Sequence, residues 1–201
     1  IAILAALNQR HATGRGQHVE VSMQEAVLNL IRISLREHQR NGVPPRSGNQ
    51  LGKTVPGTTY PCAPGGPNDW VYIYAPPQMW GAVCKVLGRP ELENNPLFKT
   101  ANDRWTNRAA LDAIVAEWTS TRSKYEAMKL MGDAGVPAGA CQDTGEVLAD
   151  PHLKARHMIV DLESPPRGSF KTVGCPLLLS DSPVNITRFP STSPMCSACS
   201  R

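Results

Sequence analysis

The chain has 201 residues, with 21 Lys and Arg against 17 Asp and Glu and a formal net charge of +4. Hydrophobic residues make up 41% of it, which excludes a disordered chain, and no apolar run approaches the roughly 18 residues of a membrane span. The length allows one large domain or two small ones. The apolar opening from Ile1 has neither an N-cap nor the basic segment of a signal peptide. We therefore expect the chain to have been cut from a longer protein.

The positive charge is concentrated at the start of the chain. Residues 1–54 hold seven Lys and Arg but only three Glu, and the remainder carries equal numbers of both signs. This distribution suits an anionic small-molecule partner, although a solvated helix face is the simpler explanation. It is too weak for the basic stripe of a nucleic-acid-binding protein, so we expect neither a nucleic-acid nor a membrane partner.

Six cysteines occur, at positions 62, 84, 141, 175, 196 and 199. The first four stand among apolar neighbours, as buried free thiols do. The last two form a C-x-x-C pair, but no further ligands follow at the spacing of a zinc site. We therefore expect no bound metal, and a reducing, cytoplasmic compartment.

The first 41 residues are predicted to be mainly helical. Residues 1–11 resemble the end of a helix, and residues 18–21 alternate in polarity like a short strand. Ser22 and Glu25 then form a capping box, which opens a helix that ends at Asn41 before a Gly. One face of this helix carries four apolar residues: Val27, Leu30, Ile31 and Leu35.

The rest of the chain is predicted to be a linker, a small domain and a return segment. Residues 42–69 are rich in Gly and Pro and are assigned to the linker. Residues 70–150 form the small domain. Its predicted elements are a strand at 70–74, helices at 78–87, 102–118 and 123–135, a short strand at 136–140 and a brief helix at 145–149. Residues 151–190 form the return segment, with a β-hairpin that pairs 158–162 with 169–173. The predicted fold class is α+β.

The loop between Ser47 and Thr54 is the best candidate site. It nearly matches the phosphate-binding pattern G-x-x-x-x-G-K-[ST], but Ser47 replaces the first glycine and Pro56 follows where a helix should begin. We reject a nucleotide-triphosphatase on these grounds. Two glycines, an amide pair and a lysine still make a donor-rich loop that can close over a carbonyl or carboxylate. The candidate residues are Gly48, Asn49, Gln50, Gly52 and Lys53. A plain surface linker is the alternative.

Residues 13–30, TGRGQHVEVSMQEAVLNL, closely resemble the class III CoA-transferases, with the formyl-CoA:oxalate type nearest. The resemblance continues in the same order through four further motifs: RSGNQ at 46–50, YPCAPGG at 60–66, AGVPAG at 134–139 and VGCP at 173–176. It covers roughly residues 1–188. Carnitine CoA-transferases and α-methylacyl-CoA racemases share the family fold, so the substrate stays open.

The resemblance implies a subunit with a Rossmann-like large domain and a small α+β domain, interlocked with a second copy as a homodimer. Residues 1–41 would end the large CoA-binding domain. In the family an aspartate attacks the acyl-CoA thioester and forms a mixed anhydride, and CoA moves to a small carboxylic acid. CoA would thus be a co-substrate, with no permanently bound cofactor. That aspartate lies before the segment matching Ile1, so we assign no catalytic residue here and expect the isolated chain to be inactive.

The resemblance also implies two segments of the substrate site. Met23 and Gln24 would lie beside the nucleophile and the thioester. The loop at residues 48–53 stands where oxalate-type members carry a run of glycines, but this chain has Leu51 and Lys53 there. We suggest that Lys53 supplies a positive charge to the acceptor carboxylate.

Two other functions remain open at this stage. An α-methylacyl-CoA racemase would need its own acid and base residues upstream of Ile1. A non-catalytic module would bind acyl-CoA or pair with an intact subunit. The tail at residues 191–201 departs from the family and is expected to be aberrant or disordered.

Overall fold

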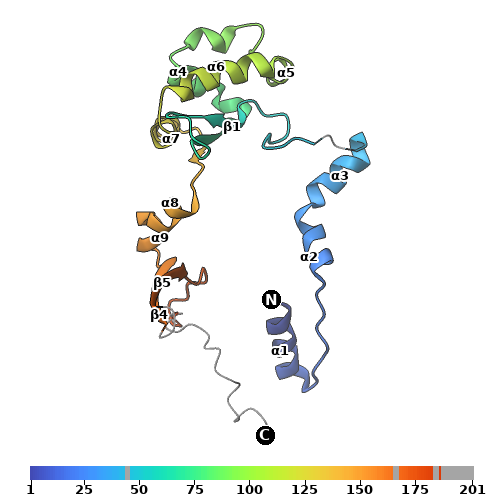
Figure 1. Cartoon of the computed structure of the whole chain (residues 1–201). Coiled ribbons are helices and arrows are strands. Elements are labelled where there is room, and N and C mark those ends of the chain that lie inside the picture. The colour runs from blue at the N-terminus through green and yellow to red at the C-terminus, as the bar shows by residue number, and fades with distance from the viewer. Residues whose placement is uncertain (44–45, 165–167, 183–185, 187–201) are drawn as a thin grey trace. The chain divides into compact units, whose positions relative to one another are not determined.

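The structure is a computed structural model that describes residues 1–43, 46–164, 168–182 and 186. The chain divides into two compact units, Ile1–Gly48 and Asn49–Arg201. Figure 1 labels most of the elements of both. Each unit is described by itself.

The first unit consists of three helices, α1 (Ala2–Thr13), α2 (Met23–Leu30) and α3 (Arg32–Asn41). The helix α1 ends at Gly14, whose φ of 70° is a conformation that glycine adopts without strain. Ser22 caps α2 as predicted, because its side chain accepts a hydrogen bond of 3.2 Å from the Glu25 backbone N–H. The single helix predicted here is divided at Ile31, where φ is −94° and ψ is 9°.

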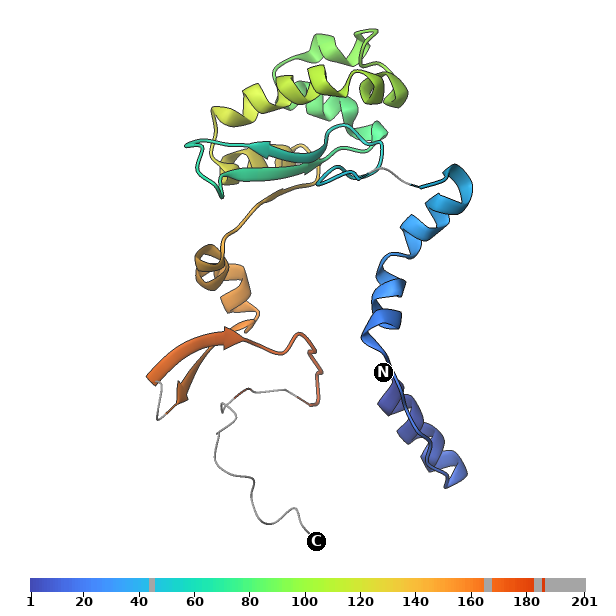
Figure 2. The same cartoon turned by 45° about the vertical axis from the view of Figure 1, so that its right-hand side comes forward.

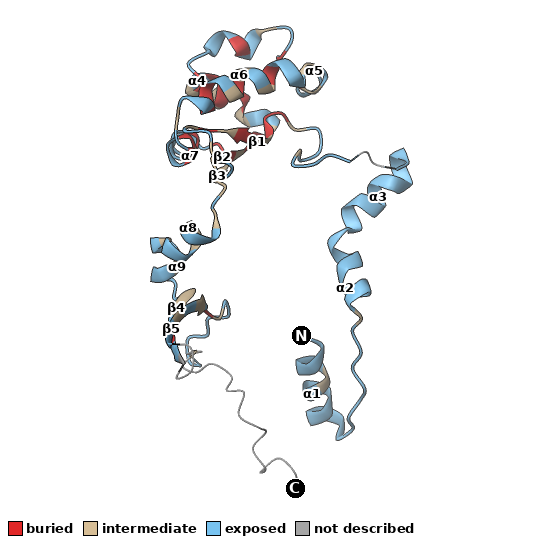
Figure 3. Cartoon of the chain, viewed as in Figure 1, coloured by how far each residue is buried: buried red, intermediate tan, exposed pale blue. Residues whose placement is uncertain are grey.

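None of the residues in these three helices is buried. The four residues of the predicted apolar face are 44–77% exposed, and Figure 3 draws most of α1–α3 in the colour of exposed residues. The strand predicted at residues 18–21 is wrong, since the structure has no strand there. An alternating segment becomes a strand only when a neighbour pairs with it.

The second unit contains a three-stranded antiparallel sheet of order β1-β2-β3. Its strands are β1 (Gly57–Pro61), β2 (Trp70–Tyr74) and β3 (Ala138–Ala140). Val71 of β2 lies opposite Tyr60 on one side and Ala140 on the other. Val71 and Ile73 are fully buried, while Tyr72 between them faces the other side of the sheet, as the period of two requires.

The helices between β2 and β3 in the chain cover the sheet, as Figure 2 shows from a second direction. They are η1 (Pro77–Met79), α4 (Trp80–Val86), η2 (Pro90–Asn94), α5 (Ala101–Thr106), α6 (Arg108–Ser120) and α7 (Lys124–Asp133). The helix predicted over 102–118 is divided at Asn107. The Asn107 side-chain amide donates to the carbonyls of Leu97, at 3.0 Å, and Asp103, at 2.9 Å. These two bonds hold the end of α5 against the preceding loop, and α6 begins after Asn107.

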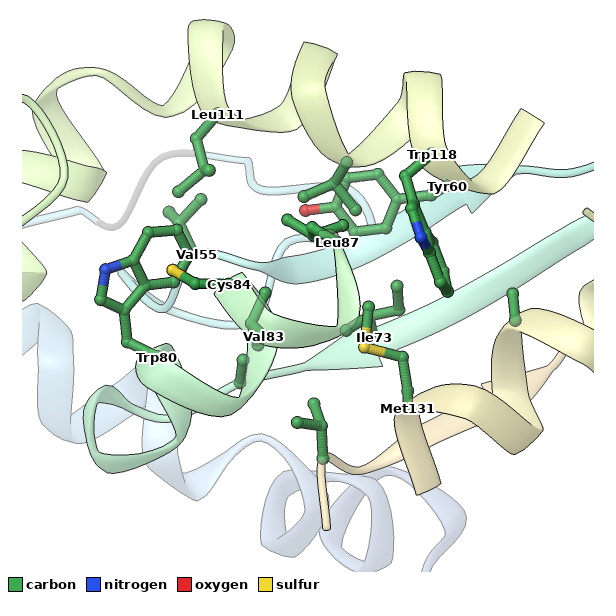
Figure 4. Packing of buried hydrophobic residues seen from close by; sticks show 14 of the residues in the cluster. Val55, Tyr60, Ile73, Trp80, Val83, Cys84, Leu87, Leu111, Trp118 and Met131 are labelled. Carbon is green, nitrogen blue, oxygen red and sulfur yellow. The ribbon is translucent and has the colours of Figure 1, made fainter. Parts of the chain in front are cut away.

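The hydrophobic core lies between this sheet and helices α4, α6 and α7 (Figure 4). The helical period of the sequence predicts an inner face for the helix at 102–118, formed by Leu111, Ile114, Val115 and Trp118. This face is confirmed, since Leu111, Val115 and Trp118 are at most 9% exposed and Ile114 packs partly buried against the core. Val55, Tyr60 and Cys62 also belong to the core, although the sequence pattern assigns them to the linker. The predicted domain boundaries stay predictions.

The remaining elements are α8 (Thr144–Ala149), α9 (Pro151–Ala155), β4 (Ile159–Ser164) and β5 (Gly168–Val173). The predicted hairpin is confirmed, with Ile159 opposite Val173. The tail predicted to be aberrant, residues 191–201, lies outside the described residues. The fold class is α+β, as predicted. Within the described ranges, no helix combines the length and the apolar character needed to cross a membrane.

Candidate functional site

The loop from Gly48 to Lys53 is held in place by its own amide side chains. Asn49 Nδ2 donates to Thr59 Oγ1 of β1 at 3.1 Å, and Gln50 Nε2 donates to the Thr54 carbonyl at 2.5 Å. The Leu51 backbone N–H adds a bond of 2.8 Å to the Gly57 carbonyl at the start of β1. Asn49 therefore fixes the loop against the sheet, while Gln50 closes the loop on itself.

Glycine is required at two points of this loop. Gly48 and Gly52 both have a φ of 56°, in the left-handed region that other residues rarely adopt. A Cβ at either position would meet no atom within 4 Å, so backbone conformation rather than space requires glycine. In the described part of the chain, the backbone N–H groups of Gly52 and Lys53 have no acceptor. Two successive free donors are suited to an anionic oxygen.

The predicted substrate-binding residues fall in both units. Lys53 is exposed and has no ion pair or hydrogen bond among the described residues, so its ammonium is available to a ligand. Met23, 87% exposed, and Gln24 open helix α2 in the first unit. The structure groups Asn49, Gln50 and Lys53 in one loop, while Met23 and Gln24 belong to a different unit. Their common role in a site stays a prediction.

A buried lysine joins three segments of the second unit. The Lys124 side chain is 6% exposed, and its Nζ donates to the carbonyls of Asn68, at 3.1 Å, and Cys141, at 2.9 Å, and to Glu146 Oε2 at 2.6 Å. Burial opposes the charge of the ammonium, but the bond to Glu146 outweighs it, so the pKa of Lys124 is raised. Tyr125 OH binds the other oxygen of the same carboxylate at 3.1 Å. All donors of Lys124 are occupied, so its role is to hold the fold together.

A second buried polar contact joins the sheet to α6. Tyr60, 2% exposed, donates its hydroxyl to Asp112 Oδ1 at 2.6 Å. Burial, followed by this bond, raises the pKa of Tyr60, and burial also raises that of Asp112. The predicted free thiols are confirmed for Cys62 and Cys84, which are buried and unpaired. Burial raises the pKa of each to about 11, so neither is a reactive thiolate at neutral pH.

The sequence pattern does not identify these buried contacts. Lys124 appears only as the first residue after the cap Ser123, and its partners lie 17 to 56 positions away. Helix α9 does have a local signal, because Asp150 precedes Pro151 and its side chain caps the helix. No group of three or more His, Cys, Asp or Glu in the described ranges could hold a metal.

Comparison with known proteins gives a consistent family assignment. The sequence model of CoA-transferase family III matches residues 1–196. The chain is 43% identical to a formyl-CoA:oxalate CoA-transferase of Streptomyces coelicolor and 42% identical to one of Streptomyces avermitilis. Each match covers 94% of this chain but 49% of the relative. The chain therefore spans about half the length of the curated relatives it matches.

Solved structures agree with the sequence comparison. A CAIB/BAIF family protein from Brucella suis is 28% identical, with a TM-score of 0.76 over 94% of this chain and 49% of that one. Rv3272 from Mycobacterium tuberculosis, at 21% identity, has a TM-score of 0.74 over 92% of this chain and 48% of its own and supports the fold alone. From the family match and the shared fold, the chain belongs to CoA-transferase family III.

Proposed function

We propose that this chain is part of an enzyme that moves CoA from an acyl-CoA thioester to a small carboxylic acid, with formyl-CoA and oxalate as the substrate pair. The proposal is supported by the identity of 43% to a relative named formyl-CoA:oxalate CoA-transferase. The observation in the structure that carries it is the loop at Gly48–Lys53, which presents two free N–H groups and a free ammonium.

In this proposal the nucleophile is an aspartate in the part of the protein that precedes the segment matching Ile1. Its carboxylate attacks the thioester carbonyl, the C–S bond breaks, and CoA leaves as the thiolate, so that a mixed anhydride forms. Met23 and Gln24 border the thioester. The N–H groups of Gly52 and Lys53 bind an oxygen of the acceptor carboxylate, and the Lys53 ammonium neutralises its charge.

The same proposal includes a homodimer in the cytoplasm. The exposed apolar residues of α1, α2 and α3 support an extensive partner surface, because a monomer rarely leaves so many large apolar side chains in water. Among them are Leu4, Val27, Leu30, Ile33 and Leu35. The unpaired thiols of the core support a reducing compartment.

The substitution Lys53→Ala in the full-length enzyme tests the role of the loop. An exposed charge pair contributes up to about 1 kcal/mol, so the KM for oxalate should rise about fivefold. The KM for the acyl-CoA should change little, because Lys53 is assigned to the acceptor. Lys85→Ala is the matched control, since Lys85 is an exposed lysine of α4 outside the loop. An unchanged KM for oxalate would remove Lys53 from the site.

An assay of CoA transfer to different acceptor acids also distinguishes this proposal from a racemase and from a non-catalytic module. A racemase would exchange the proton at the α-carbon of a 2-methylacyl-CoA with solvent deuterium and transfer no CoA to oxalate, succinate or carnitine. A non-catalytic module would bind acyl-CoA without either reaction, even within the longer protein. Transfer of CoA to one of the three acids is the result that the proposal predicts.

A further inference from the structure

A polar hollow of about 460 Å³ lies where η1, α4, η2 and the start of α5 meet. It is far along the chain from the loop at residues 48–53 and uses none of its residues. The residues that matter for its chemistry are Trp80, Glu93, Lys99 and Arg104. Neither the family match nor the names of the relatives assign a role to them.

Arg104 is 3% exposed, yet only part of its guanidinium is used by the protein. Its Nη1 donates to the carbonyls of Phe98, at 2.9 Å, and Lys99, at 3.3 Å. Within the described residues, Nε and Nη2 have no acceptor, although a guanidinium has five N–H donors in a fixed fork. The group is thus held rigidly by one nitrogen and keeps an unused donor edge.

Trp80 supplies a second unused donor beside the first. Its side chain is buried, with the residue 4% exposed, and its Nε1 has no hydrogen-bond partner. The Arg104 guanidinium carbon lies 4.9 Å from the centre of the Trp80 ring. In Figure 4 the indole nitrogen points away from the labelled core residues. A buried donor without an acceptor is destabilising, and a bound acceptor would remove that cost.

The charges around the hollow favour an anion. Arg104 and Lys99 are positive, and the exposed Lys99 ammonium has no ion pair or hydrogen bond among the described residues. Glu93 is the opposing charge. It lies over Gly81, where a Cβ would be 2.7 Å from Glu93 Oε1. The lining therefore combines two cations with one carboxylate.

We propose that this hollow binds a small oxyanion, either a free carboxylate or a phosphate group. The fork of Arg104 and the indole N–H of Trp80 donate to its oxygens, and Lys99 adds positive charge at the rim. The arginine fork matches the spacing of two oxygens on a carboxylate or phosphate. Glu93 weakens the site, so the affinity is set by the balance of the rim charges.

Equilibrium dialysis tests the proposal with labelled inorganic phosphate and, separately, with labelled oxalate. The full chain used carries Lys53→Ala in every arm, which removes the ammonium proposed to hold oxalate in the loop at residues 48–53. This measurement counts bound ligand per chain whatever the state of association. We expect one saturable site per chain for at least one ligand, about fivefold weaker in Lys99→Gln and a few fold tighter in Glu93→Gln. Lys85→Gln, an exposed lysine of the same unit outside the hollow, should leave the affinity unchanged. Trp80→Phe keeps a ring on Arg104 but removes the N–H, and should weaken binding.

The comparison of phosphate with oxalate also shows which kind of oxyanion the hollow binds. Binding of phosphate alone assigns the hollow to a phosphate group, and binding of oxalate alone or of both assigns it to carboxylates or to oxyanions in general. The proposal is overturned if neither ligand binds a saturable site with a Kd below about 10 mM, which corresponds to a binding free energy of about 3 kcal/mol. It is also overturned if Lys99→Gln and Glu93→Gln bind as Lys85→Gln does. These two rim residues are exposed, so their substitutions do not depend on repacking the core.

Discussion

Replacing Lys124 by Met should destabilise the second unit far more than the same change at a neighbouring lysine. Lys124 Nζ bonds the carbonyls of Asn68 and Cys141 and the Glu146 carboxylate at 2.6–3.1 Å. A methionine has similar length and fills the space, but it leaves both carbonyls without a donor. The change therefore removes the link between three segments without creating a large cavity.

The magnitude follows from the bonds that are lost. Each charge-assisted bond to a carbonyl contributes about 1.5 kcal/mol, and removal of the buried charge returns part of the total. Glu146 is 29% exposed and can bind water instead, so its ion pair adds little. We expect Lys124→Met to lower the free energy of unfolding by about 2 kcal/mol, or the urea midpoint by about 1 M.

Urea unfolding followed by tryptophan fluorescence measures this difference. The control is Lys129→Met on the same helix, because Lys129 pairs with Asp133 on the surface at 73% and 62% exposure. Its effect should stay within about 0.5 kcal/mol. If the two variants unfold at the same urea concentration, the buried contacts of Lys124 do not hold the unit together and the reasoning is refuted.

Two further predictions concern Gly57 at the start of β1 and Glu146, the carboxylate partner of Lys124. Gly57→Ala should lower stability by about 1–3 kcal/mol, since the new Cβ would lie 2.3 Å from the Thr54 carbonyl oxygen; a urea midpoint equal to that of the parent chain would contradict this. The bond from Lys124 lowers the pKa of Glu146 below its ordinary 4.5. The stabilisation that this ion pair gives the fold is therefore complete above pH 4.5 and is lost as the pH falls through the lowered pKa of Glu146. Between pH 6 and a pH below 4, the urea midpoint should therefore fall less in Glu146→Gln than in the parent chain. Equal falls in the two proteins would refute the assignment of this ion pair.

Local sequence signals predicted those elements whose formation depends on neighbours in the chain. The strand at Trp70–Tyr74 has aromatic and β-branched residues throughout, and the structure has it within the same bounds. Ser22 caps α2 as predicted, and Ser123, which also stands three residues before a Glu, caps α7 through the same type of bond to the backbone. The inner face of α6 followed from the helical period alone.

Contacts between distant residues could not be predicted in this way. The division of a helix at Asn107 depends on the Leu97 carbonyl, ten positions away. The polar hollow depends on the stacking of Arg104 on Trp80, which are on different helices, and no spacing rule joins them. The glycines of the loop with Gly48 are visible in the sequence, but nothing local shows that Asn49 bonds to the sheet and Gln50 to the loop itself, so that neither amide group is a wholly free donor.

The formation of oxalyl-CoA tests the central proposal most directly. In the proposed function this chain belongs to a longer protein, and that protein is incubated with formyl-CoA and oxalate before the CoA thioesters are separated by chromatography. We predict that oxalyl-CoA appears as formyl-CoA disappears, and that the 201-residue chain alone gives none. Failure of the longer protein to transfer CoA to oxalate, succinate or carnitine would contradict the proposed function. Turnover by the chain alone would show that the nucleophile lies within it.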